Sequence, residues 1–172
     1  MSDKDDTPQQ PLNGGLALYS NLQKTADWFG EPDDNLRNFA YFANQARAGF
    51  GITLFTAAGT IAGTIIAGET FFEGLAALQR GGIQDSADAT TREVTESMAR
   101  MNFDSPANRY RELRENSDEE DDEAALNREE LTSYIHLQDA VVFQGHTRHD
   151  AGFMRVQLSH VVAWTLGGPP RD

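Results

Sequence analysis

The pattern of hydrophobic and polar positions is dominated by one uncharged stretch, residues 49–68, with the sequence GFGITLFTAAGTIAGTIIAG. A helix of twenty residues extends about 30 Å, which matches the hydrocarbon thickness of a bilayer. At helical spacing, the large apolar side chains fall on one face and the small side chains fall on another. The stretch therefore predicts a long hydrophobic helix over 49–68.

The small face of this predicted helix is expected to form a helix–helix interface. Gly and Ala let a neighbouring backbone approach closely, and Thr hydroxyls can donate to carbonyls of their own helix or of a neighbour. The helical spacing predicts seven interface residues, which are Thr53, Thr56, Gly59, Thr60, Gly63, Thr64 and Ala67.

Three environments suit a helix without charges: a membrane, the core of an oligomer, or a soluble domain that leaves the threonines in water. Thr and Gly are poor helix formers in water, and a water-facing side of an acidic chain is expected to carry Asp or Glu. The stretch itself contains no acidic residue, and the next one along the chain is Glu69. The membrane span is therefore the first interpretation, and the oligomer core is the second.

Apolar residues also repeat every three to four positions on both sides of this stretch, which predicts further helices. Residues 16–29 are expected to form a short helix. Asp33 or Asp34 is expected to cap the next helix, which continues into the hydrophobic stretch. The pattern after the stretch ends at the glycine pair 81–82, which is typical of a helix C-terminus.

A further helix is predicted beyond these glycines, with Asp85 or Ser86 as its cap. Its narrow apolar stripe consists of Val94, Met98 and Met101. Two helices joined by a short turn predict a helical hairpin. The pair Ser105-Pro106 is typical of a helix start, so another short helix is expected there.

The hydrophobic period changes to two after Leu131. Alternating apolar residues predict two β-strands, within 131–144 and 153–168, joined by a long loop with the sequence QGHTRHDAG. Two strands are marginal alone, so we expect them to pack on the helices or to pair with another copy. The predicted fold class is α+β, with an N-terminal helical region followed by a small C-terminal antiparallel β module.

Changes in composition predict four segments. Residues 1–15 are polar and rich in Pro and Gly, so they are expected to be a flexible arm. The helical region covers 16–116. An acidic linker is expected at 117–127, because six of the seven residues from 117 to 123 are Asp or Glu. The β-hairpin module follows at 128–168.

The chain is strongly acidic, with 27 acidic residues against 14 basic ones and a formal net charge of −13. Twelve of the basic residues are Arg and two are Lys. A carboxylate excess with so little Lys resembles the composition of proteins from salt-in halophiles. Because negative charge repels phosphate, the charge balance argues against a nucleic-acid partner.

The sequence contains no motif that predicts catalysis or a cofactor. It lacks cysteine, a phosphate-binding loop, a dinucleotide fingerprint and a nucleophile elbow. All four histidines lie in the predicted β module, and His146 and His149 are spaced as two ligands of a zinc or nickel ion would be. A loop does not fix the geometry of such a pair, so surface or packing roles are favoured and no metal site is assigned.

These observations predict a non-enzymatic structural or assembly protein of a halophile. In the first interpretation, the hydrophobic helix anchors it in or beside a membrane, as a component of a cell envelope or a virion. In the alternative, it is a soluble, cytoplasmic oligomer that uses the Gly/Thr helix as its subunit interface. The expected partners are other copies of the chain and other structural proteins.

Overall fold

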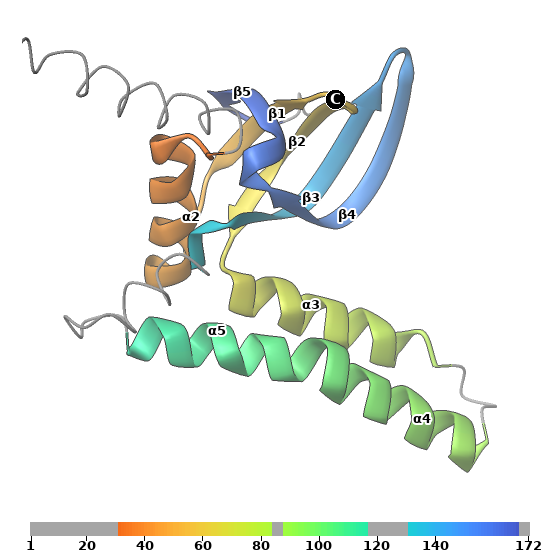
Figure 1. The fold of residues 1–172 in the computed structure, drawn as a ribbon. Coiled ribbons are helices and arrows are strands. Elements are labelled where there is room, and N and C mark those ends of the chain that lie inside the picture. The colour runs from red at the N-terminus through yellow and green to blue at the C-terminus, as the bar shows by residue number, and fades with distance from the viewer. Residues whose placement is uncertain (1–30, 84–87, 117–130, 169–172) are drawn as a thin grey trace, which may run out of the picture. The chain divides into compact units, whose positions relative to one another are not determined.

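The computed structural model describes residues 31–83, 88–116 and 131–168, and the fold is given for these residues. The predicted α+β class is confirmed, with helices packed against a five-stranded antiparallel sheet (Figure 1). The helices and strands, in chain order, are α2 (Asp34–Ala46), β1 (Gly51–Thr56), β2 (Gly59–Ile66), α3 (Gly68–Gly81), α4 (Ala89–Ala99), the π-helix η2 (Arg100–Asp104), α5 (Ser105–Glu115), β3 (Tyr134–Gln144), β4 (Thr147–Gln157), the 3-10 helix η3 (Leu158–His160) and β5 (Val161–Leu166).

The predicted hydrophobic helix over 49–68 is wrong, because this stretch forms the β-hairpin of β1 and β2. Eight of its twenty residues are Thr or Ile, whose branched side chains favour strands over helices. The two strands are joined by two alanines, and Gly59 follows with a φ of 146°, where a side chain would be strained. Within the described residues, no helix combines the length and hydrophobicity that crossing a bilayer requires.

The sheet has the strand order β4-β3-β2-β1-β5. Strands β3 and β4 confirm that the C-terminal part is antiparallel β structure, but the expected long loop is the first half of β4 after a tight turn at Gly145–His146. The chain then returns across the sheet, and β5 pairs with β1, more than a hundred residues earlier in the sequence. The C-terminal strands therefore share one sheet with the hairpin.

Helix α2 covers one face of the sheet. Asp33 caps it, as predicted, by accepting hydrogen bonds from the backbone N–H groups of Asn35 and Leu36 at 2.9 and 3.1 Å. The helix ends at Arg47, in the left-handed region, and does not continue as expected. Its apolar side packs into the main hydrophobic core, which contains Leu36, Ala40, Ala43, Ile52, Leu54, Ile65, Ile135, Leu137, Ala140, Val156 and Leu158.

Helices α3 and α5 pack against each other and form a second core at one end of the sheet. Helix α3 ends at the predicted glycines, whereas α4, η2 and α5 follow one another as one helical segment. The predicted helix start at Ser105-Pro106 is therefore wrong, because Ser105 opens α5 as a continuation of η2 and no serine side chain caps it. The buried residues of the second core are Ile66, Phe71, Phe72, Ala107, Tyr110, Leu113 and Leu131.

Four predictions concern residues outside the described ranges. They are the flexible arm at 1–15, the short helix at 16–29, the cap at Asp85 or Ser86 and the acidic linker at 117–127. In the described residues, Asp88 caps α4 by accepting a hydrogen bond from the Thr91 N–H.

Candidate functional site

The predicted interface residues lie on the hairpin and its flanks, and they do not share one face. Thr53, Thr60 and Thr64 point to the sheet face opposite α2, because the residues that alternate with them, such as Ile52 and Ile65, belong to the main core. The Thr53 hydroxyl donates to the backbone oxygen of Gly167 at 3.0 Å, which ties β1 to the end of β5.

The other four residues of the predicted interface have local roles. The Thr56 hydroxyl donates to the Gly59 carbonyl at 2.9 Å and closes the turn of the hairpin. Gly63 faces the tightly packed core side, where a Cβ would lie 3.1 Å from the backbone oxygen of Gln138. Ala67 is buried at the start of α3. The helical small face therefore does not exist, and contact of these residues with another copy stays a prediction.

The two edges of the sheet differ in charge. Edge strand β4 carries Arg148, Asp150 and Arg155, and charged side chains are a common protection of an open edge. Edge strand β5 has the sequence VVAWTL, without one charge. Its Val162 and Leu166 are 77% and 60% exposed. Of the described strands, none pairs with the outer side of β5.

The position of β5 is fixed from its inner side. The Trp164 ring meets the Phe39 ring of α2 edge to face, with the ring centroids 5.2 Å apart. Leu54, a fully buried core residue, is the strand neighbour of Trp164 in β1. An edge strand that is held this firmly is a preformed template for another strand.

A buried carboxylate joins three elements on the other side of the fold. Glu69, at the start of α3, is approached by Arg47 at the end of α2 and by Arg111 and Arg114 on α5. Burial raises the pKa of Glu69, but hydrogen bonds from Arg111 and Arg114 and the arginine charges outweigh it, so the pKa lies below its usual value. The carboxylate is already satisfied by these arginines, so we assign it a structural role.

His136 is buried where the sheet meets α3 and α5. Its ring lies against the rings of Phe71, Phe72 and Tyr110, with centroids 4.8 to 5.9 Å apart. Its Nε2 atom has no hydrogen-bond partner among the described residues. Burial, assisted by the charge of Arg155 across the strand pair, lowers the pKa of His136 to about 3. The neutral histidine is therefore a packing residue.

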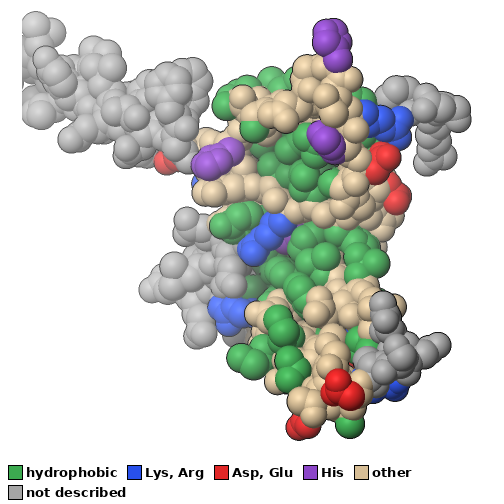
Figure 2. Space-filling view, turned by 90° about the vertical axis from the view of Figure 1, so that its right-hand side faces the viewer, with side chains coloured by type: hydrophobic (Ala, Val, Ile, Leu, Met, Phe, Trp, Pro, Cys, Tyr) green, Lys and Arg blue, Asp and Glu red, His purple; other side chains and the backbone are tan. Residues whose placement is uncertain are grey.

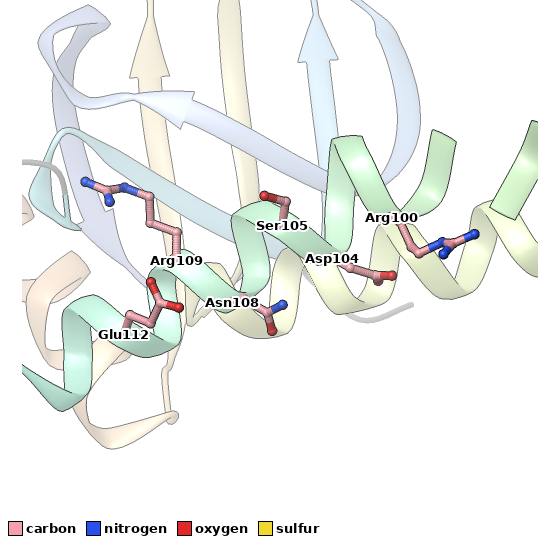
Figure 3. Close-up of a pocket in the computed structure, with 6 residues that line it drawn as sticks. All are labelled: Arg100, Asp104, Ser105, Asn108, Arg109 and Glu112. Carbon is pink, nitrogen blue, oxygen red and sulfur yellow. The ribbon is translucent and has the colours of Figure 1, made fainter. Parts of the chain in front are cut away.

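A shallow hollow lies along the outer side of η2 and α5 (Figure 3). Its lining mixes both signs of charge and contains no histidine that could activate its serine. The lining residues are Arg100, Asp104, Ser105, Asn108, Arg109 and Glu112. Such an open polar surface suits a protein contact better than a chemical reaction on a small molecule.

The histidines considered as metal ligands are not gathered into a site. His146 lies in the β3–β4 turn, and His149 lies in β4 opposite Val142. Across the described ranges, no three His, Asp or Glu side chains are grouped closely enough to hold a metal ion.

Figure 2 shows hydrophobic side chains at the surface both over the sheet and over the helices, with few Asp or Glu on that side.

The sequence predictions missed the edge position of β5 and the cluster around Glu69. The uncharged run before Gly167 was a visible signal for a strand, but its place at an edge depends on pairing with β1. The cluster has no local signal, because its arginines lie about forty residues from Glu69 or on another helix.

The comparisons with known proteins identify a family. Searches of curated proteins and of solved structures found no match. The family model described as "Gas vesicle protein GvpU-like" matches residues 33–169, which is most of the chain. This match supports a structural or assembly role over an enzymatic one. It provides no support for the virion or halophile interpretations, so both are withdrawn. The predicted transmembrane helix is withdrawn as well, because the stretch forms a β-hairpin. The chain belongs to the GvpU-like family of gas vesicle proteins.

Proposed function

We propose that this protein is a non-enzymatic component of gas vesicle assembly that binds other gas vesicle proteins through edge strand β5. The observation that carries the proposal is the family match over residues 33–169. It favours the alternative prediction of an interaction protein over the membrane-anchored one.

Three features of the described residues support β5 as the contact. The strand is uncharged, and the chain as a whole has a net charge of −13, so β5 is a place where a partner meets no acidic side chain. Its apolar side chains are exposed at both ends of the strand. Its inner side is anchored by Trp164 and by pairing with β1, so binding does not require the strand to become ordered.

In this mode, an extended segment of the partner adds a strand beside β5. Main-chain hydrogen bonds supply affinity, and side chains beside Val162 and Leu166 supply specificity. The other edge does not compete, because β4 presents charges and a glycine with positive φ at position 152.

The proposal is tested with isolated gas vesicles mixed with the purified protein, with binding measured as the fraction that floats with the vesicles. Lysine at both Ala163 and Thr165, which are exposed on β5, is expected to lower the bound fraction several-fold. The matched control is Thr147→Lys on the opposite edge, which is expected to bind like the wild type. A double variant that keeps its circular dichroism spectrum and still binds fully would exclude β5 as the contact.

A further inference from the structure

Helix α4 and the π-helix η2 that continues it carry a row of large apolar side chains on their outer side. Val94, Met98 and Met101 are 52%, 50% and 73% exposed. Spacings of four and three residues place them on one stripe. Ala99 is fully buried, which shows that the inner side of the same helix packs on the fold. In Figure 1, α4 lies beside the end of α3 that is far from the sheet.

The charge around this stripe differs from that of the whole chain. The segment from 89 to 115 contains five arginines and five acidic residues, so its net charge is zero, whereas the whole chain has −13. Two copies can therefore bring these helices together without the acidic repulsion that opposes contact elsewhere. A second copy is thus an occupant that the charge distribution allows at this surface.

The order of charges beside the stripe also favours one orientation. Glu93 and Arg100 are two helical turns apart, on the same side of the stripe, one near each end of it. If two such helices run antiparallel around an axis near Met98, Arg100 of one copy lies about 4.5 Å along the helix from the level of Glu93 of the other, within reach of the long arginine side chain. In a parallel pair, each charge would be level with its own equivalent but on the opposite side of the seam, so Glu93 and Arg100 would not be brought together.

We propose that the stripe of Val94, Met98 and Met101 binds the same stripe of a second copy, with the two α4 helices antiparallel around a two-fold axis near Met98. The thioethers fit irregular gaps between helices, which suits a self-complementary contact. Three side chains per copy make a smaller contact than the roughly 1,200 Å² that stable complexes bury, so the association is reversible. This surface is separate from β5, and the proposal goes beyond the proposed function.

The absence of cysteine from the sequence allows a direct test. In Met98→Cys, the two new thiols of an antiparallel pair lie close to the axis, so a short bis-maleimide is expected to yield covalent dimer. The control is Asn108→Cys, which is exposed on the same helical segment. Ten residues correspond to about 15 Å of helix, so antiparallel copies of residue 108 are about 30 Å apart and no cross-link is expected.

A charge exchange provides a second, independent measurement. Glu93→Arg is expected to reduce the dimer fraction in analytical ultracentrifugation, and adding Arg100→Glu is expected to restore it. Met98→Glu is expected to abolish the dimer but to leave flotation with gas vesicles unchanged, which separates this proposal from the role of β5.

Three results would overturn the proposal. They are wild-type protein that stays monomeric at all concentrations, equal cross-linking at positions 98 and 108, and a Met98→Glu variant that loses vesicle binding while the wild type is monomeric. The last result would assign the stripe to a vesicle protein and not to a second copy.

Discussion

Arg111 donates a hydrogen bond from Nε to Oε1 of Glu69 at 2.7 Å, which joins α5 to the start of α3. The Glu69 side chain is 3% exposed, so replacing its carboxylate removes the negative charge that Arg111 and Arg114 face in a partly buried site. We expect Glu69→Gln to lower the free energy of unfolding by roughly 1–3 kcal/mol in urea denaturation.

Glu73 provides the control for this variant. It also pairs with Arg111, at 3.0 Å, but its side chain is 44% exposed. Exposed ion pairs contribute little, so Glu73→Gln is expected to cost less than about 1 kcal/mol. Equal losses of unfolding free energy in Glu69→Gln and Glu73→Gln would show that burial does not determine how strongly these ion pairs stabilise the fold.

His136 predicts how stability depends on pH. Its pKa is about 3 in the fold and about 6.5 when exposed in the unfolded chain, so the unfolded state takes up a proton first as the pH falls. Stability is therefore complete above pH 6.5 and declines below it, by up to about 1.4 kcal/mol per pH unit.

The range from pH 6.5 to about 5 isolates this effect, because carboxyl groups titrate mostly below it. Urea unfolding of His136→Phe is expected to show a weaker decline over this range than the wild type. His146→Gln, in the exposed β3–β4 turn, is the control and is expected to keep the wild-type decline. A decline that persists in His136→Phe would contradict the assignment.

Asn44 links three parts of the chain. Its Oδ1 accepts from the backbone N–H of Gly68 at 2.8 Å, and its Nδ2 donates to the Leu131 carbonyl at 3.0 Å. Asn44→Ala leaves both backbone groups unpaired and buried, so a loss of roughly 2–4 kcal/mol is expected in thermal or urea unfolding. Asn38→Ala, exposed on the same helix, is expected to leave stability unchanged or slightly raised, because Ala is the better helix former. A similar loss at both positions would contradict the role of the two Asn44 hydrogen bonds.

Local signals in the sequence predicted some helix boundaries and missed others, since α2 ends at Arg47 and Asp88 caps α4 in place of Asp85 or Ser86. Asp33 is the cap of α2 and the glycine pair 81–82 ends α3, because capping and termination depend on residues within one turn. The stripe of α4 was also visible in the sequence, although its exposure was not. Period-two alternation in the C-terminal part likewise predicted antiparallel strands.

The uncharged stretch at 49–68 was misread because its local pattern fits two structures. It avoids charges since β1 and β2 are inner strands of the sheet, flanked by β5 and β3, and not because lipid surrounds a helix. Gly59 and Gly63, which suggested helix contact, serve the turn and the close packing of strands. Both strands find neighbours seventy or more residues later, and pairing at such separation leaves no local trace.

The central claim is that this protein acts on gas vesicles, and its cellular distribution tests it most directly. Cells that produce both the protein and gas vesicles are lysed gently, and the buoyant fraction is separated by centrifugation and probed for the protein. We predict that the protein floats with intact vesicles and leaves the buoyant fraction when vesicles are absent or are collapsed by pressure. A protein that stays in the non-buoyant fraction in all three conditions would contradict the account.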